Sequence, residues 1–269
     1  MTSADFATIR FLGTGGARFV VSRQIRSSAG MWLRFGDTQI QVDPGPGALV
    51  RALSALPPCV PQELDAIVLS HKHLDHAGDV NAMIEAMTSG GFRPRGALLA
   101  PRDAFEGEPV ILPYAARFVP ERHVLEEHGG PYLVNDVEVF AGIRHHHAVE
   151  TYGVHFRWRG ATVSYMPCGR YFEAQVDDYK RFAPDVLVVN VLFYRETTRA
   201  DHLTFAEARS MIGRIRPKVV VMTHFGTKML ERDPHALARE LEEEFDLRAY
   251  AADDGWTLDV SNEVAAALR

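Results

Sequence analysis

The chain has 269 residues, of which 46% are hydrophobic, and it is long enough to bury a large core. Its net charge of −6 and pI near 6.1 argue against broad electrostatic binding to nucleic acid or to an anionic membrane. Because it has only two cysteines, no signal-peptide pattern in residues 1–5 and no apolar run near the roughly 20 residues of a membrane span, we expect a globular cytoplasmic protein.

The N-terminal third begins with three predicted strands. The first spans residues 8–12 and ends in a run of glycines, which let backbone N–H groups approach an anion or a metal closely. Residues 31–35 and 39–42 alternate around a Gly-Asp turn and predict a β-hairpin. Asp43 ends this hairpin, before a helix predicted over residues 48–56. It can either cap that helix or form a hydrogen bond to a metal-ligating histidine.

The strongest signal follows an apolar strand predicted over residues 66–69. Three imidazoles and a carboxylate occur there within six residues. His71 and His73 are two positions apart, so on an extended segment both rings project to one side. Asp75 and His76 follow, just before a glycine that lets the backbone turn. Two histidines on one side and an Asp/His pair on the other can serve two metal ions, whereas a plain solvated loop needs no imidazoles.

The pattern His-x-His-x-Asp-His after a hydrophobic strand resembles the metallo-β-lactamase-fold hydrolases. The resemblance covers nearly the entire chain, and it implies one domain over residues 1–269. The fold that it implies is a four-layer αββα sandwich, in which two mixed β-sheets lie face to face with helices outside. Further metal ligands should then follow along the chain in a set order.

The middle of the chain mixes signals before the next strand. A helix is predicted over residues 80–87 and a short strand over residues 97–100. Prolines and charges fill much of the segment 92–136, which we interpret as peripheral and expect to carry substrate-facing loops.

Three consecutive histidines follow a strand predicted over residues 137–141. Neighbours on an extended chain face opposite ways, so only one of the three points easily into a given site. His147, with a glycine six residues later that opens a strand, is similar to the third-histidine segment of the tRNA 3′-processing endonucleases and cyclic phosphodiesterases of this fold. The resemblance implies His147 as a ligand. His145 on the same strand face is the alternative, and His146 is a neighbour or a substrate contact.

A second hairpin, predicted over residues 152–158 and 161–166, leads to Cys168. In the families that this chain resembles, an aspartate at this strand end bridges both metals. A thiolate is a good zinc ligand, and one subclass of true metallo-β-lactamases has a cysteine at this second-metal position. The alternative is a cysteine packed as a small hydrophobe. Because a proline and a glycine flank Cys168, we favour the ligand, which would make the site softer and oxidisable.

The last third repeats the design of an apolar strand followed by a histidine. After a helix and a buried strand, predicted over residues 172–182 and 185–192, Thr204 with Glu207 fits a capping box. His202 precedes this cap and is similar to the proton-donating histidine of the His-x-Thr motif in the tRNA-processing branch, or it is a plain loop histidine. His224, after an apolar run, resembles the last ligand of the family. The chain then closes with a helix and two strands, over residues 234–245, 249–252 and 256–260.

The resemblance implies two adjacent metal sites: His71, His73 and His147 in one, and Asp75, His76 and His224, joined or bridged by Cys168, in the other. Water held between two cations loses a proton near neutral pH, and the metals polarise the substrate. Asp75 is expected to orient that water or pass on its proton, and His202 to protonate the leaving oxygen. The expected cofactor is Zn²⁺, two ions per chain, with Mn²⁺ or iron as alternatives.

Residues 12–16 and 22–28 look like the corresponding segments in the phosphodiester branch of this superfamily. Arg23 and Arg26 are candidates for phosphate oxygens, and Lys228 for an anionic group of the substrate. The acidic balance and the lack of an evident basic insertion argue against tRNA. We therefore predict a hydrolase of a small phosphodiester, such as a cyclic phosphate or nucleotide. The alternatives are lactone or β-lactam-type acyl hydrolysis and a non-hydrolytic redox or binding protein on the same fold. A homodimer is expected by analogy.

Overall fold

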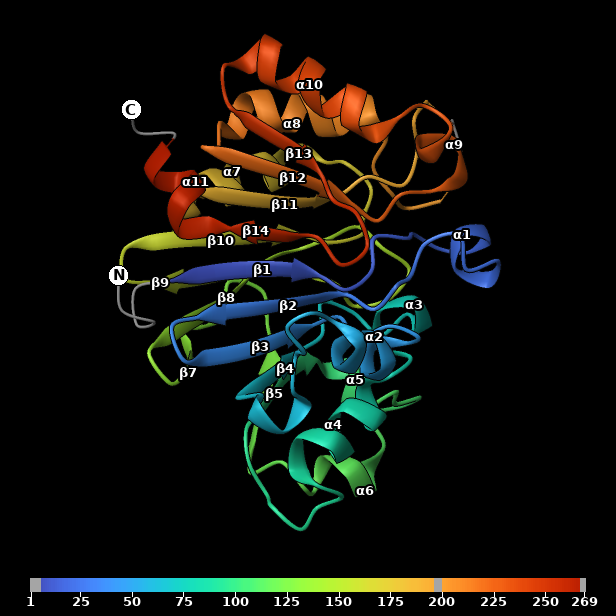
Figure 1. Cartoon of the computed structure of the whole chain (residues 1–269), viewed down its shortest axis with the longest axis vertical. Helices are drawn as coiled ribbons and strands as arrows, with labels where there is room; N and C mark the ends of the chain where they lie inside the picture. The colour runs from blue at the N-terminus through green and yellow to red at the C-terminus, as the bar shows by residue number, and fades with distance from the viewer. Residues whose placement is uncertain (1–5, 196–199, 267–269) are drawn as a thin grey trace.

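A computed structural model of the chain describes residues 6–195 and 200–266. Residues 1–5, where no signal peptide is expected, lie outside the described part. Two seven-stranded sheets, counted over the described residues, lie face to face, and helices cover their outer faces (Figure 1). The predicted αββα sandwich is thereby confirmed.

The first sheet has the strand order β14-β1-β2-β3-β4-β5-β6. Its strands β14, β1, β2 and β3 pair antiparallel, and β3 to β6 pair parallel, so the sheet is mixed. The strands are β1 (Ala7–Phe11), β2 (Met31–Phe35), β3 (Thr38–Val42), β4 (Ala66–Val68), β5 (Ala97–Pro101), β6 (Glu121–Leu125) and β14 (Thr257–Asp259).

The second sheet has the order β13-β12-β11-β10-β9-β8-β7. It is also mixed, because β7 to β10 pair antiparallel and β10 to β13 pair parallel. Its strands are β7 (Tyr132–Val134), β8 (Val137–Arg144), β9 (Tyr152–Trp158), β10 (Ala161–Met166), β11 (Val186–Asn190), β12 (Val219–Thr223) and β13 (Arg248–Ala251).

Helices cover the outer face of each sheet. The first sheet packs against α2 (Ala48–Ser54), the 3₁₀ helix η2 (Pro61–Glu63), α4 (Val80–Thr88), α5 (Arg102–Phe105) and α6 (Pro113–Ala116). The second packs against α7 (Glu173–Phe182), α8 (Phe205–Ile215) and α10 (Pro234–Phe245). Four more helices lie at strand ends or close the chain: α1 (Phe19–Ser22), α3 (Leu74–Ala77), α9 (Thr227–Leu230) and α11 (Val260–Ala266).

Periodicity explains these assignments. In α4, Val80, Met83, Ile84 and Met87 are buried at the spacing of one helical face, which packs on the sheet. Between the sheets, alternate strand residues meet, and the ring of Phe35 stacks on that of Phe156 with centroids 6.1 Å apart. Burying each such side chain contributes about 1.5–3 kcal/mol.

The segment 92–136, interpreted as peripheral from the sequence, supplies two sheet edges. β6 and β7 are the last strands of the first and the second sheet. The two closing strands belong to different sheets. β13 joins the second sheet, and β14 pairs with β1 of the first. Four-residue helices such as α3 were not predicted, since one turn is too short to show periodicity.

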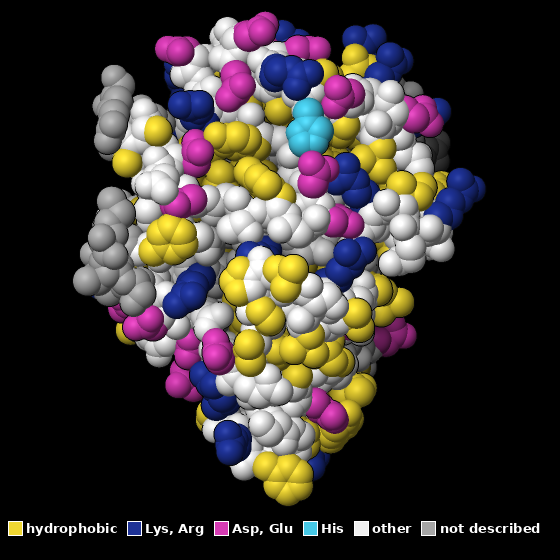
Figure 2. Space-filling view, viewed as in Figure 1, with side chains coloured by type: hydrophobic (Ala, Val, Ile, Leu, Met, Phe, Trp, Pro, Cys, Tyr) yellow, Lys and Arg dark blue, Asp and Glu magenta, His cyan; other side chains and the backbone are white. Residues whose placement is uncertain are grey.

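On the face shown in Figure 2, acidic and basic side chains are interspersed, so this face carries no extended patch of one charge. Exposed apolar side chains occur on and just after α2, at Val50, Leu53 and Leu56. The expected homodimer stays a prediction. None of the helices in the described ranges is long and apolar enough to cross a membrane.

Candidate metal centre

Loops that follow strands of both sheets carry the candidate ligands to one place. β4 leads to three histidines and to Asp75 on α3, and β8 leads to His147. β10 ends just before Cys168, and β12 ends just before His224. Because parallel strands end on the same side of a sheet, residues far apart in the chain become neighbours there.

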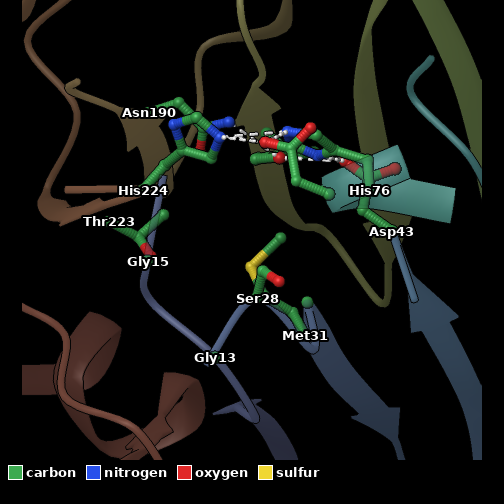
Figure 3. Close-up of a pocket in the computed structure, with 12 residues that line it drawn as sticks. Gly13, Gly15, Ser28, Met31, Asp43, His76, Asn190, Thr223 and His224 are labelled. Atoms are coloured by element: carbon green, nitrogen blue, oxygen red, sulfur yellow. Dashed lines mark hydrogen bonds and ion pairs between the residues drawn. The ribbon is translucent and has the colours of Figure 1, made fainter. Parts of the chain in front are cut away.

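Asp75, His76 and His224 form the mixed cluster, whose ligand atoms lie within 4.8 Å of one another. Nε2 of His76 is 3.0 Å from Nε2 of His224, and Oδ2 of Asp75 is 3.4 Å from that same atom of His224. Sγ of Cys168 lies 3.5 Å from Nε2 of His76 and 3.6 Å from Nε2 of His224. A cavity of about 30 Å³, enough for one water molecule, adjoins this cluster (Figure 3).

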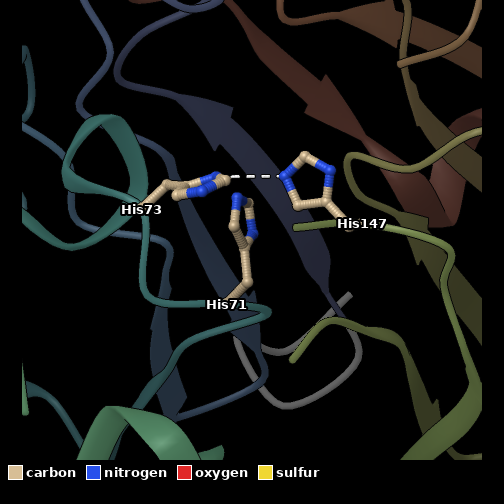
Figure 4. A group of neighbouring side chains, drawn as sticks. All are labelled: His71, His73 and His147. Carbon is tan, nitrogen blue, oxygen red and sulfur yellow. Dashed lines mark hydrogen bonds between the residues drawn. The ribbon is translucent and has the colours of Figure 1, made fainter. Parts of the chain in front are cut away.

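His71, His73 and His147 form the histidine cluster, and their rings converge from two separate segments (Figure 4). Nδ1 of His73 is 3.0 Å from Nε2 of His147. Nε2 of His71 is buried and has no hydrogen-bond partner among the described residues. A buried polar atom left unpaired costs about 1–3 kcal/mol. A metal ion at this position would accept its lone pair.

Cys168 adjoins both clusters. Sγ of Cys168 and the ligand atoms of His71 and His76 all lie within 4.8 Å of one another. The same holds for Sγ of Cys168 with the ligand atoms of His147 and His202. Imidazole, thiolate and carboxylate donors together suit zinc and related transition metals. The donor set therefore fits a transition-metal centre.

Asp43 orients the ligands from behind. Its carboxylate accepts hydrogen bonds from the backbone N–H and the hydroxyl of Ser70, at 2.7 and 2.6 Å, and from Tyr165 Oη at 3.0 Å. Its Oδ2 is also 2.9 Å from Nδ1 of His76, and Ser70 Oγ in turn is 3.0 Å from Nδ1 of His71. Of the two roles open for Asp43, the structure shows the bond to a ligand histidine, because the N-cap of α2 is a glycine.

The backbone around the centre is tight. Asp43 and His224 both have positive φ, 49° and 61°, which is uncommon for residues with a side chain. A Cβ on Gly45 would lie 2.0 Å from the carbonyl oxygen of Asp75, and one on Gly16 would lie 2.7 Å from Nδ1 of His224. Only glycine fits at these two positions, so the glycine turns hold the ligand segments by close backbone contact.

Opposite charges stabilise each other within the mixed cluster. Burial alone would raise the pKa of Cys168, but the neighbouring histidines, His224 first, hold it well below its usual range. Burial would lower the pKa of His224, yet Cys168 and Asp75 raise it to about 9. Burial of Asp75 opposes its ionisation, and His76 and His224 outweigh that effect and lower its pKa. Without metal, the mixed cluster is thus a set of ion pairs.

The histidine cluster behaves differently. Burial, with His76 nearby, lowers the pKa of His71 to about 4. Burial likewise lowers the pKa of His147 to about 4. Both rings are therefore neutral near pH 7, as metal ligation requires.

The three consecutive histidines take three different positions. His147 lies in the histidine cluster, with Nδ1 3.0 Å from the carbonyl oxygen of Asp201. His145 is buried beneath it, where Nδ1 is 3.1 Å from the carbonyl oxygen of Cys168 and Nε2 is 3.1 Å from Gln175 Nε2. His146 is exposed and stacks on another ring.

His202 lies beside both clusters. Its ring centroid is 5.2 Å from that of His147 and 5.8 Å from that of His224. The predicted capping box is present immediately after it, because Thr204 and Glu207 bond reciprocally at the start of α8. This cap fixes the backbone that presents His202.

The other predicted substrate contacts have partners outside the two clusters. The guanidinium of Arg23 is 6.0 Å from the ring centroid of a phenylalanine in α1. Nη1 of Arg26 is 2.7 Å from the carboxylate of Asp253, and Lys228, an exposed residue of α9, pairs at 2.9 Å with the glutamate that follows this helix. Their role toward a substrate stays a prediction.

Three residues of the centre were not predicted as site residues from the sequence. Asn190 donates to Tyr165 Oη at 3.1 Å and to Cys168 Sγ at 3.5 Å. Asp254 accepts from the backbone N–H groups of Thr14 and Ser27, at 2.9 and 2.7 Å, and so fixes the first glycine turn. The one signal available for Tyr165 and Asn190 was a polar group near the end of a buried strand.

The described donors of the centre differ in their exposure to solvent. Four donors are buried, and they form the floor: His71, His76, Cys168 and His224. Four are partly exposed, and they define the mouth: His73, Asp75, His147 and His202. Among the described residues, the donors at the mouth are therefore the ones within reach of solvent.

The chain matches a family model and a relative in sequence. The model of the beta-lactamase superfamily domain matches residues 38–225, a range that includes every candidate metal ligand. An uncharacterised protein of Methanocaldococcus jannaschii is 28% identical over 229 residues, which cover 82% of this chain and 84% of that protein.

Solved structures share the fold at lower identity. The metallo-β-lactamase fold protein YhfI from Bacillus subtilis has a TM-score of 0.75 and 19% identity, covering 95% of this chain and 100% of that one. The short form of human tRNase Z has a TM-score of 0.71 and 15% identity, covering 94% and 99%. At this level of identity the likeness is one of fold.

Proposed function

The chain belongs to the β-lactamase superfamily, and from that premise we propose that it is a metal-dependent hydrolase of small phosphodiesters. One observation carries the proposal: the donor atoms of the mixed cluster and the histidine cluster meet around Cys168, where buried donors form a floor and partly exposed donors form a mouth. A tRNase is among the structures of similar fold, which supports a phosphodiester as the bond to be cleaved.

Seven side chains would hold the metal: His71, His73 and His147 on one side, Asp75, His76 and His224 on the other, and Cys168 between them. Two divalent ions at these donors would supply Lewis acidity toward a phosphoryl oxygen and lower the pKa of water. The buried floor excludes bulk water, which strengthens every electrostatic interaction in the site.

Two residues at the mouth would move protons. The Asp75 carboxylate is ionised near pH 7, because its neighbours lower its pKa, so it can orient the attacking water and accept a proton. His202 would donate a proton to the leaving oxygen. Its ring is within 6 Å of the rings of His147 and His224, at 5.2 and 5.8 Å, and its backbone is fixed by the capping box.

The proposed substrate is a small molecule rather than a polynucleotide. The net charge is −6, and on the face shown in Figure 2 the acidic and basic side chains are interspersed, so that face offers no extended basic track for an RNA backbone. A phosphodiester small enough to reach the mouth, such as a cyclic phosphate or a nucleotide, needs no such track.

The test combines metal content with turnover. Elemental analysis and hydrolysis of bis-p-nitrophenyl phosphate are measured for the wild type, for Cys168→Ala and for the control Cys59→Ala, which removes the other buried cysteine. We expect two metals per chain in the wild type and the control, and fewer, with lost turnover, in Cys168→Ala. Unchanged metal and turnover in Cys168→Ala would assign its thiol to packing. One metal and no cleavage in any protein would contradict the phosphodiesterase.

Acyl hydrolysis is the second candidate, and Cys168 favours it, because the resemblance includes a lactamase subclass with a cysteine at the second metal. Lactone and β-lactam substrates are therefore assayed in parallel. Turnover of these alone would replace the phosphodiester proposal. Bound metal without turnover of any ester would favour a non-hydrolytic redox or binding protein.

A further inference from the structure

His146 directly precedes His147 in the chain and stacks on Phe172, and neither of these two rings belongs to a donor cluster. We propose that His146 and Phe172, flanked by Arg170, form a subsite for a flat aromatic group on the substrate, such as the base of a nucleoside phosphodiester. This inference rests on the proposed function and names the group that would accompany the scissile phosphate.

The two rings form a platform. The imidazole of His146 and the phenyl ring of Phe172 have centroids 4.1 Å apart and planes inclined by 17°. His146 is exposed and Phe172 is only half-buried, so the stack stands at the surface. Aromatic side chains of this kind accept a further ring by stacking, which contributes about 1–3 kcal/mol per base and tolerates any base.

The platform is fixed relative to the metal ligands. His146 precedes His147, and its carbonyl oxygen accepts the backbone N–H of Arg170 at 2.9 Å. Nε of Arg170 donates to Oδ1 of Asp201 at 3.0 Å. The carbonyl oxygen of Asp201 in turn lies 3.0 Å from Nδ1 of His147. The same contacts therefore position the platform and one side of the mouth.

Arg170 supplies polar recognition at the edge of the platform. A guanidinium has five N–H donors, and the contacts recorded for Arg170 use one on Nε and one on Nη2, both toward Asp201. The side chain is 61% exposed, so its other donors face solvent. A base presents carbonyl and ring-nitrogen acceptors in its plane, which a guanidinium beside the stack can bind.

A flat, polar-edged ring fits this surface better than an alkyl group does. An alkyl ester group would gain little from an exposed imidazole and would leave the donors of Arg170 to water. A stacked base uses both the ring face and the donors. The platform and Arg170 would therefore determine which substituent of the phosphodiester binds best, and the metal centre would determine which bond is cleaved.

Two esters with the same leaving group isolate this preference. Thymidine 5′-(p-nitrophenyl phosphate) and methyl p-nitrophenyl phosphate release the same phenolate, and only the first carries a base. For the metal-loaded wild type we expect kcat/KM to favour the thymidine ester by about tenfold, mainly through KM, as one stacked base provides. Affinities for thymidine 5′-phosphate and methyl phosphate, from calorimetric titration, provide a readout that needs no turnover.

Variants of His146 assign the preference to the platform. His146→Ala should bring the kcat/KM ratio and the affinity ratio close to 1, and His146→Phe, which keeps a ring, should preserve both. The control is His235→Ala, which removes an exposed histidine on α10 and should keep the wild-type ratios. Metal content is measured for each protein, so that loss of His147 as a ligand is recognised separately.

The outcomes separate the two proposals. Equal kcat/KM for the two esters in the wild type would overturn the subsite and leave a phosphodiesterase. Hydrolysis of neither ester would overturn the proposed function, and the titrations would then decide the subsite: equal affinities for the two monophosphates would overturn it. If the kcat/KM ratio and the affinity ratio are unchanged in His146→Ala, that result would also overturn the subsite.

Discussion

Cys168 differs from an aspartate in ways that act on its immediate neighbours. A thiolate is a softer donor, and its single sulfur lies about equally far from His76 and His224. Its negative charge raises the pKa of His224 to about 9 against the effect of burial. Cys168, the residue that departs from the family pattern, therefore also raises the pKa of its neighbouring candidate ligand His224.

Metal binding should release protons for that reason. At pH 7 the imidazole of His224 is protonated in the metal-free protein, and it must lose the proton to bind a metal. Cys168→Ala removes the anion that holds this proton, so zinc binding should release fewer protons in the variant. Calorimetric titration with zinc in buffers of different ionisation enthalpy measures the number released. The same number in the wild type, the variant and the control Cys59→Ala would contradict this electrostatic coupling.

His155 should make the protein sensitive to acid. This residue on β9 is fully buried, its ring stacks on Phe182 with centroids 3.6 Å apart, and burial holds its pKa well below the usual value. Above pH 6.5 the ring is neutral in both the folded and the unfolded chain. As the pH falls below about 6.5, only the unfolded chain takes up the proton, so the free energy of unfolding decreases.

Urea denaturation between about pH 8 and pH 5 measures this loss. We expect the free energy of unfolding to fall less steeply below pH 6.5 in His155→Gln than in the wild type. The control His235→Gln changes an exposed histidine and should keep the wild-type slope. An unaltered slope in His155→Gln would assign the acid sensitivity to other groups.

At the scale of the element, strand ends decide where chemistry gathers. Tyr165 lies near the end of β10 and Asn190 at the end of β11, so the parallel pairing of these strands places their polar groups side by side. Tyr165 Oη donates to Asp43, which contacts His76. The ends of two buried strands thus connect Cys168 to the residue that orients a ligand of the mixed cluster.

Tyr165→Phe tests this connection. The variant keeps the ring but removes the donor to Asp43 and the acceptor for Asn190, so we expect the metal affinity to fall by about 10- to 100-fold. Competition with a chromophoric chelator measures that affinity. The control Tyr250→Phe removes a hydroxyl that bonds Glu263 on another part of the fold. Equal affinities in the two variants would show that the hydroxyl of Tyr165 does not support the ligands.

Sequence reasoning located elements and motifs that depend on local spacing. The hairpins, α10 and the capping box at Thr204 need only neighbours in the chain, so their residue patterns predict them. The ordered series of histidines carried the family resemblance from which the fold and the candidate ligands were predicted. Tyr165 and Asn190 were missed because a polar residue in an apolar strand shows no partner until the strands pair. α3 was missed because one turn has no period.

At the scale of the whole molecule, Asp254 joins distant parts of the chain. It holds the backbone N–H groups of Thr14 and Ser27, and the carbonyl oxygen of Thr14 accepts the N–H of Phe225 at 2.8 Å, next to His224. Such a contact across most of the sequence cannot be inferred from local patterns, because nothing near Asp254 indicates its partners. It links the glycine turn to His224, the last candidate metal ligand in the chain.

Asp254→Ala should therefore weaken both stability and metal binding. Its removal leaves partly buried N–H groups without an acceptor, which should lower the free energy of unfolding by about 2–3 kcal/mol. Freed from its anchor, the turn should hold His224 less firmly and reduce zinc affinity. The control Asp253→Ala removes a carboxylate that is 49% exposed and pairs with Arg26 and His235, and it should cost at most about 1 kcal/mol. Equal losses in both would assign the effect to surface charge.

The position of Asp254 in the chain has a consequence for synthesis. A growing polypeptide has made every donor atom of the two clusters once His224 is added, but Asp254 and β14, which closes the first sheet on β1, come only afterwards. Until then, the glycine turn beside His224 lacks its two backbone hydrogen bonds to Asp254. We therefore expect the chain to bind a metal ion firmly only after translation has passed His224, when β14 can close the first sheet.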